Sequence, residues 1–157
     1  MQKQYRPGAK GALLDIYEQA IAGLQDLIRE VPDETLTVIT DPYTSDENCR
    51  SLQTILTHIV HAGYGYATSI HNLDGLNRTR PDKQFRTSIA EYLDDLDKVF
   101  RYTEEVFRDI RNEELEQYDN TLKILTRWGQ SYDIEQLMEH AIVHILRHKR
   151  QIGKIIS

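Results

Sequence analysis

Apolar residues recur at spacings of three and four along much of the chain, and this spacing is typical of amphipathic helices. The first such stretch runs from about Lys10 to Val31, and Pro32 ends it because proline cannot continue the backbone hydrogen bonding of a helix. The second begins near Ser51, whose hydroxyl can cap a helix, and continues to about Ile70. Both stretches are therefore predicted to be helices that bury one face.

Two further helices are marked by capping boxes, in which two side chains three residues apart satisfy free backbone N–H groups at a helix start. Ser88 and Glu91 form one such pair, ahead of an apolar stripe that continues to Ile110. Asp133 and Gln136 form the other, and they open the helix that closes the sequence. The pattern thus predicts four helices in all.

Long polar connections separate these helices. Residues 33–48 and 72–85 are predicted to be loops, and each contains a turn signal, Asp41-Pro42 in the first and Asp74-Gly75 in the second. Between residues 113 and 132 the helical pattern is weak, which leaves room for an extended stretch over residues 122–128. The connections therefore do not fix the order in which the helices run up and down.

Helices of about 22 residues are about 33 Å long, and four of them predict an all-α protein with a four-helix bundle and long connecting loops. A chain of 157 residues is also of a size that buries a sizeable core in one domain. We therefore expect a single bundle domain over residues 1–157.

Composition limits the cellular location and the classes of binding partner that we expect. The one cysteine, Cys49, cannot form an internal disulfide, which fits a reducing cytoplasm. No stretch approaches the roughly 20 apolar residues needed to cross a bilayer, and the first residues have no apolar signal core. A net charge of −6 argues against nucleic acid as a partner. The basic cluster at residues 147–154 instead complements the negative end of a helix dipole. We expect a cytoplasmic protein that binds neither membrane nor nucleic acid.

The most informative residues are the histidines of the last predicted helix. His144 and His148 are four residues apart, so they lie one above the other on one helix face. At about 100° per residue, His148 falls within the apolar stripe and His144 at its edge, whereas His140 turns about 40° toward the polar face. On the second predicted helix, His58 can turn into a mouth of the bundle and His61 is expected in solvent. His71, at the end of that helix, is expected only to cap it.

Two interpretations of the inward-facing histidines remain open on these grounds. Buried imidazoles can simply be hydrogen-bonded within a core. They can also share a divalent cation, because an unmatched buried polar group costs about 1–3 kcal/mol and one ion satisfies three rings at once. Imidazole nitrogen suits zinc, copper, iron and nickel alike.

The chain resembles the DinB-like family over nearly its full length, on three segments. Residues 51–60 are similar to the family's second-helix segment, which ends near its first metal-binding histidine. Trp128-Gly129 followed by a capped helix is the second segment. The third and most specific, residues 137–152, matches the family's H-x-x-x-H-R-G-Q-I ending, except that Lys149-Arg150 replaces Arg-Gly. This departure leaves the histidines intact and puts any role of that arginine and glycine in doubt.

The resemblance implies a four-helix bundle in which His58, His144 and His148 are three metal ligands. It further implies a divalent nickel, zinc or iron ion and a homodimer. Characterised members of the family include transferases that use a low-molecular-weight thiol and isomerases assisted by such a thiol, whereas many members have no known activity.

Three hypotheses for function follow. The first is a metal-dependent enzyme that acts on small molecules, namely a thiol S-transferase or a related detoxifying enzyme. The second is a non-catalytic, stress-related metal-binding dimer, which a fourth protein ligand such as His61 or His140 would favour. The third is a structural dimeric bundle without metal. No catalytic acid or base stands out in the sequence. Three aromatic residues, Tyr64, Tyr66 and Trp128, could line the mouth of the site. For the two tyrosines ordinary packing is favoured.

Other chemistries lack their residues. The sequence contains no Glu-x-x-His pair of the kind that di-iron bundles use. It also has no His-Glu-x-x-His zinc protease motif, no Cys-x-x-Cys pair and no Gly-rich phosphate loop.

Overall fold

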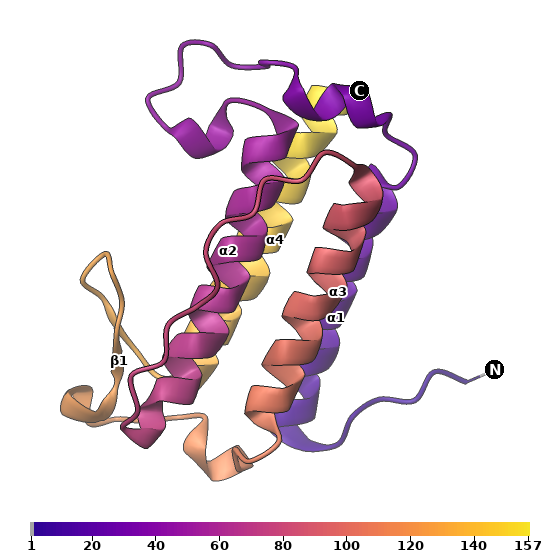
Figure 1. Ribbon diagram of the computed structural model, residues 1–157. Coiled ribbons are helices and arrows are strands. Elements are labelled where there is room, and N and C mark those ends of the chain that lie inside the picture. The colour runs from indigo at the N-terminus through magenta and orange to yellow at the C-terminus, as the bar shows by residue number, and fades with distance from the viewer. Residues whose placement is uncertain (1) are drawn as a thin grey trace.

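Four long helices dominate the computed structural model, which describes residues 2–157 (Figure 1). The only strands in this part of the chain, β1 (Ile124–Leu125) and β2 (Ser131–Tyr132), form a small antiparallel hairpin. The predicted all-α helical bundle is therefore confirmed. Its helices are α1 (Gly8–Ile28), α2 (Leu52–His71), α3 (Ile89–Phe107) and α4 (Ile134–Ile156).

The predicted helix starts agree closely with the observed ones. Ser51 caps α2, and its hydroxyl and the Thr54 side chain form a reciprocal capping box. At α3 the predicted box is only half formed. The Ser88 hydroxyl accepts from the backbone N–H of Glu91, but the Glu91 carboxylate bonds the Ser88 hydroxyl at 2.9 Å instead of its backbone. The capping box of Asp133 at α4 forms as expected.

The two predicted ends of α1 and α3 lie a few residues too far along the chain. α1 stops at Ile28, and a tight turn follows in which the N–H of Val31 bonds the carbonyl of Ile28 at 3.0 Å. α3 stops at Phe107, where Ile110 closes a similar turn at 3.1 Å. In both places an apolar side chain continues the stripe although the backbone has left the helix, because helix ends commonly tighten into such turns.

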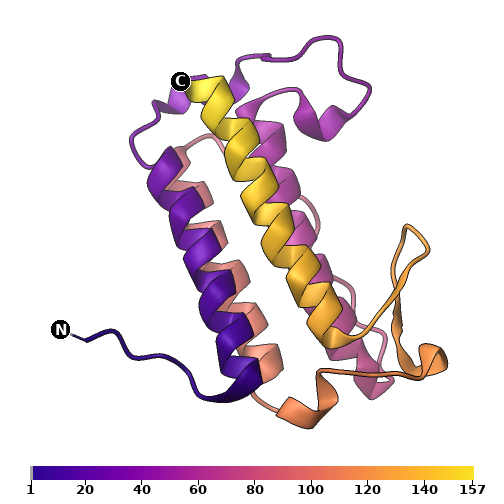
Figure 2. The ribbon, with the colours of Figure 1, turned by 180° about the vertical axis from the view of Figure 1, so that it is seen from behind.

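The helices run in the order up, down, down, up. α1 packs against α3 and α4, and α2 packs against the same two helices. Lys10 at the start of α1 donates to the carbonyl of Phe107 at the end of α3, so this pair is antiparallel. Thr57 and Tyr92, both early in their helices, meet at 2.6 Å, so α2 and α3 are parallel. Figure 2 shows the parallel pair α1 and α4 from the other side.

One continuous core fills the space between the four helices. It is built from the inward stripes that the sequence pattern predicts, together with apolar residues of the connections, such as Leu36 and Leu115. Burial of these side chains is the main stabilising contribution to the fold. Large side chains that are almost completely buried include Tyr17, Leu24, Ile55, Leu56, Tyr92 and Phe107.

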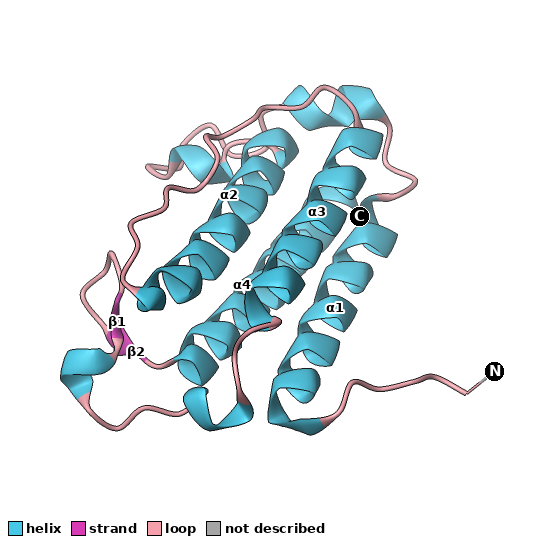
Figure 3. Cartoon of the chain, turned by 60° about the horizontal axis from the view of Figure 1, so that its bottom comes forward, coloured by secondary structure: helices cyan, strands magenta, loops and turns pink. Residues whose placement is uncertain are grey.

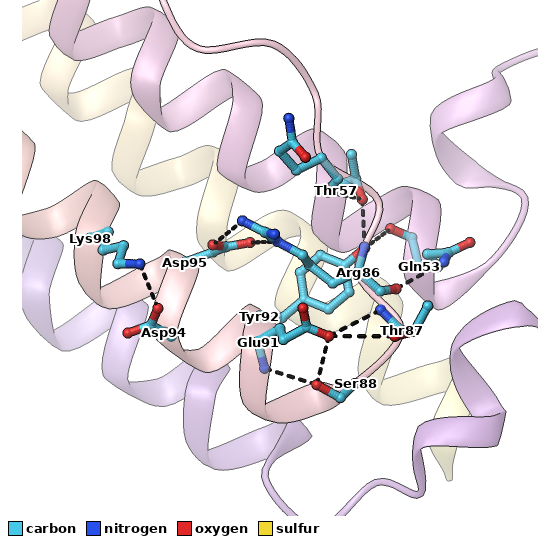
Figure 4. Close-up of polar contacts among 11 residues, drawn as sticks. Gln53, Thr57, Arg86, Thr87, Ser88, Glu91, Tyr92, Asp94, Asp95 and Lys98 are labelled. Atoms are coloured by element: carbon cyan, nitrogen blue, oxygen red, sulfur yellow. Dashed lines mark hydrogen bonds and ion pairs between the residues drawn. The ribbon is translucent and has the colours of Figure 1, made fainter.

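Parallel packing of α2 and α3 requires a long return, and the chain makes it along the outside of α2 (Figures 1 and 3). We call residues 75–88 the crossover. Its last residues are fixed to the bundle by the Arg86 guanidinium, which pairs with the buried Asp95 carboxylate at 2.9 Å (Figure 4). The backbone of Arg86 is held as well. Its N–H donates to the Tyr92 hydroxyl at 3.1 Å, and its carbonyl accepts from the Gln53 side chain at 2.9 Å.

Between α3 and α4 the chain forms short turns and the β1–β2 hairpin, beside the lower end of α2 (Figure 3). Ile124 pairs with Tyr132 and Leu125 with Ser131. The extended stretch expected at residues 122–128 is thus a strand only at residues 124–125. Throughout residues 2–157, every helix is too short or too polar to cross a membrane.

Candidate metal centre

Three histidine rings from two helices meet between α2 and α4, where His148 is buried and the other two are half-buried. His58 lies on α2, while His144 and His148 lie one turn apart on α4, which packs against α2 in the opposite direction. The Nε2 atom of His144 lies 2.9 Å from Nε2 of His58 and 3.1 Å from Nε2 of His148. We call these three side chains the histidine cluster. The sequence prediction that they come together is therefore correct.

The spacing of the donor atoms suits one bound cation. Two nitrogens held about 2.0–2.1 Å from a tetrahedral ion lie about 3.3–3.4 Å apart, close to the separations observed. The potential donor atoms of the three rings all lie within 4.8 Å of one another, and within residues 2–157 no fourth His, Cys, Asp or Glu joins them. His61 and His140, the candidates for a fourth ligand, are outside the cluster. Three protein ligands would leave at least one position for water or substrate.

Gln151 orients one of the rings. Its side-chain oxygen lies 2.8 Å from Nδ1 of His148, three residues earlier on α4. Because an amide oxygen can only accept, Nδ1 carries the proton and the lone pair of Nε2 faces the other two rings. A ligating histidine commonly has such a partner on its second nitrogen.

Burial keeps the cluster neutral. Desolvation, followed by repulsion from His148 and Lys83, lowers the pKa of His58 to about 4. Desolvation, followed by the charges of His148 and His58, lowers the pKa of His144 to about 3. Desolvation also lowers the pKa of His148, against the opposing effect of its bond to Gln151. At neutral pH the three rings are thus uncharged, and each has one nitrogen with a lone pair that can bind a cation.

Two polar groups from the loop before α2 lie near the cluster. The charge of Asp46 acts on both His58 and His148, and its carboxylate accepts from the Cys49 thiol at 3.5 Å. The bond from the backbone N–H of Asn48 is the largest of several effects that lower the pKa of Asp46. Burial, the largest effect at Cys49, raises the pKa of its thiol, and the Asp46 carboxylate adds to the increase. The thiol is therefore held protonated and is a poor nucleophile.

Aromatic rings cover the cluster toward the hairpin. Tyr66 meets His144 edge-on, with 5.8 Å between ring centroids. His140, which we expected on the polar surface, is instead half-buried and stacked on Trp128 at 4.7 Å and 20°. The prediction was wrong because the hairpin folds back over the start of α4 and covers that face. Tyr64 faces elsewhere and packs against Tyr102 of α3.

Of the three clustered histidines, His58 lines a cavity of about 770 Å³, together with Tyr66 and Trp128. A second cavity of about 740 Å³, near the end of α3 and the start of α4, is lined by none of the three clustered histidines. The first is therefore the cavity in which chemistry at the cluster would take place. A volume of this size accommodates a small organic molecule.

Four cationic residues line this cavity. Arg78 is paired with Asp74, and the other three are Arg80, Lys83 and Arg127. They come from the crossover and from the β1–β2 hairpin. His61, expected in solvent, is half-buried in the same wall. Desolvation, and then the charges of these three cations, lower the pKa of His61 to about 4. The wall formed by the crossover and the hairpin therefore carries an excess of positive charge.

Sequence reasoning did not find this cationic wall or the groups around Asp46. All lie in connections without a periodic pattern, and only the fold brings them to the cluster. Gln151 entered as part of a motif, and its role was not predicted. Its position three residues after His148 was the available signal, because residues at that spacing share a helix face.

Comparison with known proteins gives one match. The model of the DinB family matches residues 1–157. No curated protein and no solved structure shows significant similarity to the chain. Because this match covers the whole chain, the chain belongs to the DinB family.

Proposed function

We propose that this protein is a metal-dependent enzyme that acts on small molecules, and that its activity is of the thiol S-transferase type or a related detoxification. His58, His144 and His148 would bind a divalent nickel, zinc or iron ion. The observation that carries the proposal is the convergence of three Nε2 atoms at 2.9 and 3.1 Å beside a cavity large enough for a substrate.

A divalent ion in such a site acts as a Lewis acid and lowers the pKa of a water or thiol bound to it. The residues of the chain prepare the site for it. Gln151 fixes the tautomer of His148, and burial keeps all three rings uncharged at neutral pH. Tyr66 and Trp128 bound the space in which a second reactant would lie.

The reacting thiol would come from outside the protein. Cys49 is the one cysteine of the chain, and its raised pKa makes it a poor nucleophile. A low-molecular-weight thiol in the cavity would supply the sulfur instead. In the transfer its sulfur bonds an electrophilic carbon, the leaving group departs with the electron pair, and the thiol proton passes to solvent.

The first experiment measures metal in protein purified without a histidine tag, by elemental analysis. The wild-type chain should contain about one divalent ion, and His144→Ala and His148→Ala should lose it. His71→Ala is the matched control, because His71 ends α2 outside the histidine cluster. Wild-type protein that contains no metal and takes up none would contradict the proposal and leave a structural bundle.

The second experiment measures turnover. Metal-loaded protein is mixed with a bacillithiol-type thiol and 1-chloro-2,4-dinitrobenzene, and formation of the thioether is followed by absorbance. A rate above that of His144→Ala supports the enzyme. Tight metal binding without turnover across several thiols and electrophiles would instead favour a non-catalytic, stress-related metal-binding protein.

We also propose that residues 1–157 are one domain, because a single core joins all four helices. The expected homodimer and cytoplasmic location follow from the family resemblance and from the lone cysteine. Light scattering of the purified protein tests the dimer, since a monomer mass at working concentration would contradict it.

A further inference from the structure

The wall of the cavity is cationic although the chain as a whole is acidic. The chain carries a net charge of −6, yet Arg80, Lys83 and Arg127 gather at one cavity, with Asp82 as an opposing carboxylate. Arg78 also lines this cavity, but Asp74 neutralises it at 2.8 Å. An excess of positive charge therefore faces the space beside His58.

These cations lack the partners that arginine and lysine usually find. Within residues 2–157, none of the three forms an ion pair with a carboxylate. The Nη1 atom of Arg80 donates to the carbonyl of His61 at 3.1 Å, and this bond holds the Arg80 side chain against α2. Lys83 donates only to the side-chain oxygen of Asn48, at 2.9 Å. Their charge remains available to a ligand.

The sequence of α2 makes room for the Arg80 side chain. Gly65 lies under it, and a Cβ atom at that position would overlap Nη1 of Arg80. Burial, and then the charge of Arg127, lower the pKa of Arg80, so the guanidinium is held against its own desolvation and against a second cation. Such an arrangement costs free energy unless an anion compensates for it.

We propose that this wall binds the carboxylate or phosphate group of an anionic small molecule. Arg80 and Arg127 recognise the anion, because a planar guanidinium donates two parallel hydrogen bonds to either group. Lys83, an exposed residue of the same wall, adds electrostatic attraction. That the anion belongs to a substrate of the histidine cluster rests on the proposed function, whereas the anion site itself does not.

The one tryptophan of the chain provides a direct readout, because Trp128 lines the same cavity. Metal-free protein is titrated with inorganic phosphate and, separately, with succinate, and both Trp128 fluorescence and the heat of binding are recorded. Succinamide, which has the shape of succinate without its charge, is the ligand control. We expect saturable binding of at least one anion, weakened by added salt, and no binding of succinamide.

Variants then locate the site. Arg127→Gln, at the exposed tip of the hairpin, should weaken anion binding about tenfold or more, as the loss of a charged hydrogen bond predicts. Arg80→Gln should do the same. Arg101→Gln removes an exposed cation on α3 that does not line the cavity, and it should leave the affinity unchanged. Circular dichroism establishes that each variant is folded.

The two ligand titrations and the variants distinguish the possible outcomes. Binding of phosphate alone or of succinate alone supports the site and identifies the anionic group. No heat and no fluorescence change with either ligand would overturn the proposal, and so would equal losses in the Arg101 and Arg127 variants. His144→Ala should retain anion binding even though it loses metal, so failure of the metal centre and failure of the anion site are distinguishable.

Discussion

Gln151 and His148 are joined by a hydrogen bond of 2.8 Å between the amide oxygen and Nδ1, across one turn of α4. The bond decides which nitrogen of the imidazole carries the proton. Its partner nitrogen, Nε2, lies 3.1 Å from Nε2 of His144 and is left as a donor atom. The helix thus carries two of the three proposed metal ligands, and the residue that orients one of them, within eight residues.

Replacement of this glutamine should weaken metal binding without unfolding the bundle. Gln151→Leu keeps the approximate shape but removes the acceptor, so His148 loses its fixed tautomer. We expect a 10–100-fold lower affinity for Zn²⁺, measured by competition with a chromophoric chelator. Gln151→Glu retains an acceptor and should recover most of the affinity.

The control for this substitution is Gln19→Leu, at an exposed position of α1. It should leave the Zn²⁺ affinity unchanged. Equal affinities of the wild-type and Gln151→Leu proteins would show that the bond does not orient the ring.

The metal-free protein should lose stability as the pH falls below about 6.5. The folded state lowers the pKa of His58 to about 4 and that of His144 to about 3, from an ordinary value of 6.5. Between these values the unfolded chain binds protons that the folded chain does not, so acid favours unfolding. Above pH 6.5 both states are neutral at these rings and the effect vanishes.

Urea denaturation of chelator-treated protein at a series of pH values between 7.5 and 5 measures this dependence. His144→Asn removes one titrating ring and should flatten the slope of unfolding free energy against pH. An unchanged slope in this variant would mean that His144 does not resist protonation in the folded state.

Two glycines should respond oppositely to alanine. A Cβ atom on Gly63 would lie 2.6 Å from Cγ1 of Val99 and 3.3 Å from the hydroxyl of Tyr17, between α2, α3 and α1. Overpacking of this kind costs about 1–3 kcal/mol, which exceeds the gain of about 1 kcal/mol from better helix propensity.

Gly153, within α4, is the matched control because nothing lies within 4 Å of its Cβ position. Gly153→Ala should raise the free energy of unfolding by up to about 1 kcal/mol. Thermal denaturation of both variants tests the pair. A Gly63→Ala protein as stable as Gly153→Ala would mean that the helices separate at no cost.

The ion pair at the end of the crossover should contribute to stability. Arg86→Met leaves the Asp95 carboxylate, only 9% exposed, without its partner at 2.9 Å. We expect a loss of about 1–3 kcal/mol in unfolding free energy, which is the cost of an unsatisfied charged group. Arg101→Met, on the exposed side of α3, should change it little. Similar stabilities of the two variants in urea would contradict this role.

The sequence was sufficient to predict the helices and the histidine cluster, for related physical reasons. A helix face repeats at a fixed angle, so the apolar stripe of α4 also indicates which way His148 points. The predicted start of α4 follows from one local interaction, between Asp133 and Gln136. Helix phase made His58 a candidate partner of His144 and His148. It left open whether these rings share a cation or are only hydrogen-bonded, and the family resemblance favoured the cation.

The helix order and the cavity wall were beyond such reasoning. Parallel packing of α2 and α3 depends on contacts such as Thr57 with Tyr92, 35 residues apart, which no local pattern encodes. His140 was misplaced because its exposure depends on the hairpin that brings Trp128 over it. The positions of Arg80 and Arg127 likewise follow only from the path of two irregular segments.

The crossover carries Arg80 and Lys83 on a segment outside the four helices. A substitution at either position alters the charge facing the cavity and leaves the contact between α2 and α4 intact. A few substitutions in the connections could therefore change which small molecules the cavity binds. The three histidines proposed to bind a metal ion would keep their positions, because the helices hold them.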